Sequence, residues 1–166
     1  MFTILNHENA SEKIKSLVLE LLHDPRLEVR QMASTVLGGL FHCKFISNEK
    51  TILDEFSSKL KGFNRKKAVK SESINPERLV ELHAGALGLC AYVNAFPYDV
   101  PDNLPEVLVT LSEHLNDPQP IASTIRDTLS NFKRTHYDNW RDHKQKFTSN
   151  QLCILMDLLL SPSYYA

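Results

Sequence analysis

The sequence has few of the residues that build tight turns, phosphate-binding loops or disulfide frameworks. Only five of its 166 residues are glycine, and it contains no glycine-rich phosphate loop and no nucleophile elbow. The three cysteines are an odd number, widely spaced among apolar neighbours, which is typical of reduced thiols inside cells. These absences argue against a disulfide-stapled secreted domain and against the common nucleotide-binding enzymes.

Long hydrophobic runs and an excess of charge are also missing. No stretch of about 18 apolar residues occurs, and His7 and Glu8 interrupt the start of the chain, where a signal peptide needs apolar residues. Nineteen basic and twenty acidic residues give a net charge of −1, which does not suit the whole chain to nucleic acid or an anionic membrane. We expect no membrane partner, no secretion by a signal peptide and no sequence-specific binding of nucleic acid.

Apolar residues recur with helical spacing along most of the chain, and alternating β-branched runs are few. The pattern predicts a single all-α domain of seven or eight helices. In the first two helices Ile14, Leu17, Met32 and Val36 are predicted to face the core. The predicted helices span about residues 11–23, 25–43, 47–61, 76–96, 105–115, 121–132, 137–147 and 149–160.

One turn signal occurs twice. Leu-His-Asp-Pro and Leu-Asn-Asp-Pro each close one helix, and a second helix follows with Val29-Arg30 or Ile125-Arg126. Asp24 is predicted to cap the second helix, with Pro25 in its first turn. The pairing favours HEAT-like α-helical hairpin repeats, a fragment of an α-solenoid, in which aspartate and arginine tie neighbouring turns together. A generic helical bundle is the alternative.

Small residues gather in the helix predicted over 76–96, where Ala84, Gly85, Ala86 and Gly88 lie close together. Glycine costs about 1 kcal/mol in a helix interior. The cluster therefore predicts close packing against the backbone of a neighbouring helix.

Few residues suggest catalysis. His42 lies beside Cys43, but His23 and His83 are far away in sequence, and no Cys-x-x-Cys or His-x-x-x-His pair offers metal ligands. We expect no catalytic residue, no metal and no enzyme activity. A hydrolase that uses Cys43 or Cys90 is the remaining catalytic alternative.

A basic cluster lies between residues 59 and 70, where no acidic residue occurs. It could bind phosphates, acidic protein or nucleic acid, or act as a nuclear import signal, and a solvated loop over 62–75 is the alternative. Its members are Lys59, Lys61, Arg65, Lys66, Lys67 and Lys70.

Aromatic residues mark two further places. Trp140 is predicted to fasten a polar helix to the core together with Tyr137 and Phe147, with a partner-facing hot spot as the alternative. At the end of the sequence, Ser161 and Pro162 should stop the last helix. The following Tyr164, Tyr165 and Ala166 then form either a frayed end or a plug whose carboxylate and tyrosine hydroxyl bind a basic pocket.

Three segments resemble one family. Phe132–Trp140, His143–Phe147 and Asp157–Ala166 closely resemble the C-terminal region of the proteasome activator complex subunit 4 family, whose members are large HEAT-repeat solenoids. The resemblance implies a helical repeat domain over 1–160 and a docking tail over 161–166. It also implies that Tyr164, Tyr165 and Ala166 form a hydrophobic-tyrosine-any motif. By the same resemblance, this motif is expected to insert into the α-ring of the proteasome core particle and to promote gate opening without ubiquitin.

The same resemblance implies further properties. Family members read acetylated histones through a bromodomain-like region, and an asparagine-phenylalanine pair implicated there aligns with Lys44 and Phe45. Lys44 lacks the amide that would bind an acetyl oxygen. The resemblance also implies inositol polyphosphate as a ligand, a location in nucleus and cytoplasm, and a link to DNA repair. A chromatin-binding module is thus the alternative to a proteasome-docking module.

Overall fold

The computed structural model describes residues 2–61 and 75–159, and side chains within 10–61 and 75–156. This part of the chain contains α-helices and one 3₁₀ helix and no strand, which confirms the all-α prediction. No helix in these ranges is long and apolar enough to cross a membrane. The elements are α1 (Phe2–Leu21), α2 (Leu27–His42), α3 (Glu49–Lys61), α5 (Pro76–Ala95), α6 (Leu104–Ser112), α7 (Ile121–His136), α8 (Trp140–His143), η1 (Lys144–Lys146) and α9 (Ser149–Leu159).

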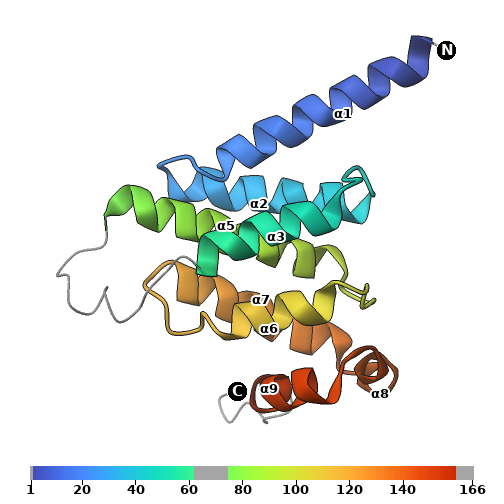
Figure 1. Cartoon of the computed structure of the whole chain (residues 1–166), viewed down its shortest axis with the longest axis vertical. Coiled ribbons are helices and arrows are strands. Elements are labelled where there is room, and N and C mark those ends of the chain that lie inside the picture. The colour runs from blue at the N-terminus through green and yellow to red at the C-terminus, as the bar shows by residue number, and fades with distance from the viewer. Residues whose placement is uncertain (1, 62–74, 160–166) are drawn as a thin grey trace.

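The helices stack in successive layers from α1 to α9 (Figure 1). Helices α2, α5 and α7 lie next to one another in one row, while α3, α6 and α9 follow one another in a second row. Helix α5 contacts α2, α3, α6 and α7, so it is buried on nearly every side. This order is that of stacked helical hairpins, as the repeated turn signal predicted.

Side-chain hydrogen bonds show that α2 and α5 run parallel and in register. Arg30 bonds to His83, Ser34 to the carbonyl of Leu87, and His42 to the carbonyl of Ala95, each across 53 residues. A constant separation along two helices requires that they point the same way. Parallel neighbours are expected for corresponding helices of consecutive hairpins, because a short connection makes each hairpin itself antiparallel.

The glycines of α5 lie against α3. A Cβ atom added at Gly85 would come 2.9 Å from the carbonyl oxygen of Phe56, and one added at Gly88 would collide with the Phe56 ring. The predicted close approach is therefore confirmed, and α3 is the neighbour. Only the absence of a side chain lets the two helices pack at this distance.

The two repeated turns are held by their arginines. Arg30 Nη1 donates to the carbonyl oxygens of Asp24 and Pro25 at 2.7 and 3.0 Å, and Arg126 Nη2 donates to that of Leu115 at 2.7 Å. The arginines thus bind backbone oxygens rather than aspartate carboxylates. The predicted cap is wrong, because α2 begins at Leu27 and the Asp24 carboxylate accepts from the Arg26 amide in a local turn.

Helix α1 differs from the predicted first helix. It begins at Phe2 instead of residue 11, and it diverges from the body of the molecule (Figure 1). Val18 and Leu22 pack into the core, whereas Ile14 and Leu17 are about half exposed, at 49% and 55%.

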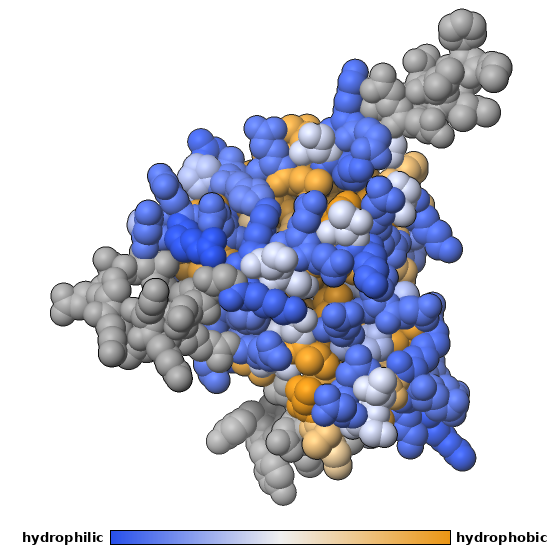
Figure 2. Space-filling model, viewed as in Figure 1, coloured by the Kyte–Doolittle hydropathy of each residue, from blue (hydrophilic) through white to orange (hydrophobic). Residues whose placement is uncertain are grey.

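The prediction that Ile14 and Leu17 face inward is therefore wrong. The same prediction for two residues of α2 is wrong as well. Met32 and Val36 are exposed because α5 covers the opposite face of α2 and the divergent α1 covers only part of the remainder. Apolar side chains are visible in this region of the surface in Figure 2. Periodicity identified the apolar stripes but not which of them a neighbour covers.

The polar helix predicted over 137–147 is divided into α8 and η1. The Trp140 and Phe147 rings pack together with centroids 5.5 Å apart, and Phe147 is buried. The expected aromatic anchor is thus present, but Tyr137 takes no part in it and is 74% exposed. Two short turns, instead of one straight helix, bring both Trp140 and Phe147 against the core.

Candidate functional site

The tail residues Tyr164, Tyr165 and Ala166 lie outside the described residues, so their role stays a prediction. The helix that precedes them is firmly anchored. Leu155 of α9 is fully buried and Leu152 packs against the core, where α9 contacts α6 and α7. The sequence after Leu159 therefore continues from a fixed point at the α9 end of the stack (Figure 1).

Lys44 and Phe45 form the C-terminal cap of α2. The Lys44 amide donates to Phe41 O at 3.1 Å and the Phe45 amide to Leu40 O at 3.0 Å, which is the hydrogen-bond pattern of a Schellman motif. Lys44 has a φ of 57°, in the left-handed region. Glycine and asparagine adopt this conformation most readily. The geometry thus gives position 44 a clear structural role.

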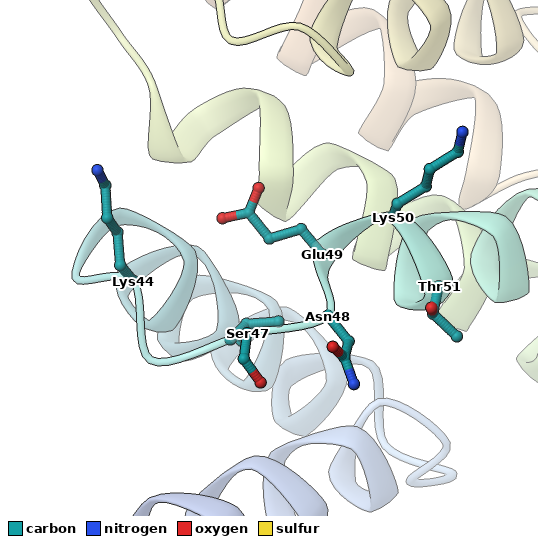
Figure 3. A pocket seen from close by; sticks show the side chains of 7 residues that line it. Lys44, Ser47, Asn48, Glu49, Lys50 and Thr51 are labelled. Atoms are coloured by element: carbon teal, nitrogen blue, oxygen red, sulfur yellow. The ribbon is translucent and has the colours of Figure 1, made fainter.

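The segment after this cap borders an open hollow of about 510 Å³ between α2 and α3. Six of its seven lining residues are polar or charged, and in Figure 3 the side chains of Lys44, Glu49 and Lys50 extend to one side of the loop while Ser47 and Asn48 extend to the other. Phe45 is 56% exposed and is not part of the lining. Nothing in this arrangement favours an acetyl-lysine pocket, which would need an enclosed apolar wall.

The basic cluster is described only at its start, because Arg65, Lys66, Lys67 and Lys70 fall outside the described residues. Lys59 and Lys61 lie in the last turn of α3. The Lys59 ammonium group lies 3.0 Å from His23 Nε2 and 5.9 Å from the centre of the Phe56 ring. Lys59 therefore links the turn after α1 to α3 instead of projecting freely toward a partner.

A buried polar network connects three helices. Arg30 Nε of α2 donates to His83 Nδ1 of α5 at 3.1 Å, and His83 Nε2 lies 3.1 Å from Thr124 Oγ1 of α7. Burial, together with the nearby Arg30 charge, lowers the pKa of His83 from 6.5 to about 4. His83 is therefore neutral at physiological pH. It accepts on Nδ1 and donates from Nε2. No local signal identifies this network, because its members are 41 and 53 residues apart.

Cys90 is not an activated thiol. Burial raises the pKa of Cys90 to about 12, so its thiolate is not formed near neutral pH. His42 is bound through Nδ1 to the carbonyl of Ala95, and its neighbour Cys43 is exposed. Among the described residues no group of three or more histidine, cysteine or acidic side chains could hold a metal ion.

Comparison with known proteins identifies the family. A sequence model described as "Proteasome activator complex subunit 4-like, C-terminal" matches residues 79–166, which is more than half of the chain. The human protein named proteasome activator complex subunit 4 is 48% identical across the whole chain, and proteasome activator subunit 4 of Arabidopsis thaliana is 38% identical over 98% of it. Proteasome activator BLM10 of Saccharomyces cerevisiae is 27% identical over 98% of the chain.

These relatives are much longer proteins. The chain spans 9% of the human and Arabidopsis relatives and 8% of the yeast one. The match to the family model runs through the last helix and includes the three tail residues. The chain belongs to the proteasome activator complex subunit 4-like family, and its residues 79–166 match the C-terminal region of that family.

Proposed function

We propose that this chain is a docking module of a proteasome activator, which binds the α-ring of the core particle through Tyr164, Tyr165 and Ala166. The observation that carries the proposal is the family match, which extends through Ala166. The tail would contribute a terminal carboxylate as a charge-assisted acceptor and Tyr165 as a flat ring with a hydroxyl group. Both suit a small basic pocket, and their insertion would favour gate opening without ubiquitin.

The body of the module would hold the tail in place. Helix α9 is anchored on α6 and α7, so the tail starts from a fixed point. Three residues bury little area, and ordering them costs conformational entropy, so the tail alone should bind weakly. In proteins as long as the relatives, further contacts would raise the effective concentration of the tail at its pocket.

The proposed role is that of a regulator and not of an enzyme. The named relatives are proteasome activators, and the buried Cys90 thiol, with its pKa of about 12, is unsuited to nucleophilic attack. Hydrolysis would then occur in the core particle, while this chain would control the entry of substrates into that particle.

The first test compares binding of the whole chain to purified core particles with and without residues 164–166. We expect deletion to weaken binding at least tenfold, because the carboxylate and both tyrosines are lost. Deletion of Ala166 alone should have a similar effect, since it moves the carboxylate by one residue. Ser163→Ala, which leaves the motif intact, is the matched control. Equal binding of the intact and deleted chains would refute the proposal.

A further inference from the structure

The end of the molecule that carries α8 and α9 exposes basic side chains around an exposed tyrosine. We call this set, made of Arg134, Tyr137, Arg141 and Lys144, the α8 surface. All four residues are exposed, and the Tyr137 side chain is 74% exposed. Figure 2, in the same view as Figure 1, shows hydrophilic side chains at the lower right, where α8 lies, and apolar side chains beside them toward α9.

The backbone beneath the α8 surface is pinned to the core. His136 is 1% exposed, its ring stacks on Phe132 at 4.0 Å, and its Nε2 lies 3.2 Å from the carbonyl oxygen of Asp99. On the other side, Trp140 packs on Phe147, and Lys146 Nζ donates to the carbonyl oxygen of Val100 at 2.8 Å. The basic groups therefore project from a fixed scaffold, which lowers the entropy that a partner must remove on binding.

No ion pair with a described residue holds the cations of the α8 surface, and the two acids of the same segment, Asp138 and Asp142, are themselves exposed. Arg134 donates to the side-chain oxygen of Asn131, a neutral group, at 2.8 Å. Arg141 and Lys144 form no ion pair with any of the described residues, whereas nearby Lys146 pairs with Asp99 at 3.3 Å. Three cationic side chains are thus available to acidic groups of a partner.

The α8 surface lies close to the start of the tail. Helices α8 and α9 occupy the same end of the stack (Figure 1), and only η1 and two further residues separate them in sequence. Seven residues follow Leu159, and even a fully extended chain of that length spans no more than about 25 Å. A partner that holds the tail residues is therefore near the α8 surface as well.

We propose that the α8 surface binds an acidic protein surface on the same partner that receives the tail. This inference rests on the proposed function. Arginine and tyrosine are among the residues enriched at energetically important positions of protein interfaces. A protein partner fits better than nucleic acid, because three cations in a chain of net charge −1 would neutralise few phosphates.

The test is a charge reversal with a matched control. The variant Arg134→Glu/Arg141→Glu/Lys144→Glu and the control Lys13→Glu/Arg26→Glu/Lys50→Glu change the net charge by the same amount at exposed positions. We expect the first to weaken binding of the full chain to core particles about tenfold and to reduce its dependence on salt. The control should change binding less than twofold. Circular dichroism and thermal melting verify that both variants fold.

Each outcome has a distinct meaning. Equal binding by the charge-reversed variant and the control overturns the inference, whatever the tail deletion does. A loss on charge reversal without a loss on tail deletion supports the α8 surface and refutes the proposed tail function. Tyr137→Ala gives a second measurement, with an expected loss of about threefold. Binding of duplex DNA that the same charge reversal abolishes, with core-particle binding unchanged, would assign the surface to nucleic acid and overturn the inference.

Discussion

Lys44 occupies a backbone conformation that suits glycine. Its φ of 57° places a side chain in the left-handed region, where non-glycine residues are strained. We expect Lys44→Gly to raise the free energy of unfolding by up to about 1 kcal/mol, measured by chemical denaturation. Lys44→Ala is the matched control, since it removes the charge and keeps the strain. Equal stability of the two variants would show that the cap conformation is not strained.

His83 should make stability depend on pH. Its folded-state pKa of about 4 lies below the unfolded value near 6.5, so the unfolded chain binds more protons between these values. The contribution of His83 to the free energy of unfolding is complete above pH 6.5. It falls as the pH drops through this window and is lost below about 4. The loss is at most about 3 kcal/mol.

Urea denaturation at several pH values measures this effect. His83→Gln keeps an acceptor for Arg30 and a donor for Thr124 but does not titrate, so its stability should vary less between pH 6.5 and 4. The pKa of His143 is also lowered, mainly by burial, so His143 adds a pH dependence of stability in the same direction to the wild-type chain and to the His83→Gln variant alike. The same pH dependence in both proteins would rule out His83 as the source.

At the scale of the element, α5 depends on its glycines. Gly88→Ala should lower the free energy of unfolding by about 1–2 kcal/mol, because overpacking against Phe56 outweighs the better helix propensity of alanine. Gly39→Ala in α2 is the control. A Cβ atom there meets nothing within 4 Å, so stability should rise by about 0.5 kcal/mol. A stabilising effect at both positions, seen in thermal melts, would contradict the close approach of α3 and α5.

The elements also show where local patterns are sufficient. Helices α3, α5, α7 and α9 fall close to their predicted ranges, because apolar spacing and stop signals act within a few turns. The start of α2 was missed, since Asp24 and Pro25 form a turn before the helix and Arg30 folds back on their carbonyl groups. A contact between a side chain and a preceding turn leaves no periodic trace in the sequence.

At the scale of the whole molecule, the two ends of the stack differ. Both ends expose apolar side chains, Ile14, Leu17, Met32 and Val36 at the α1–α2 end and Ile154 and Met156 in α9, but only the α8–α9 end also carries the α8 surface and leads into the tail. The chain covers less than a tenth of its long relatives. The tail and charge-reversal experiments therefore measure the part of the affinity that this end supplies, without the further contacts of a longer activator.

The sequence by itself determined the all-α class, the ranges of α3, α5, α7 and α9, the small residues of α5 and the family likeness of the tail, because each depends on local spacing or on a contiguous motif. Tertiary structure alone decided that α5 is the central helix, that Met32 is exposed, and that His83 joins Arg30 and Thr124. Burial and pKa depend on which faces are covered by helices about 40 to 50 residues away. Those contacts between distant helices form only when the helical hairpins stack on one another.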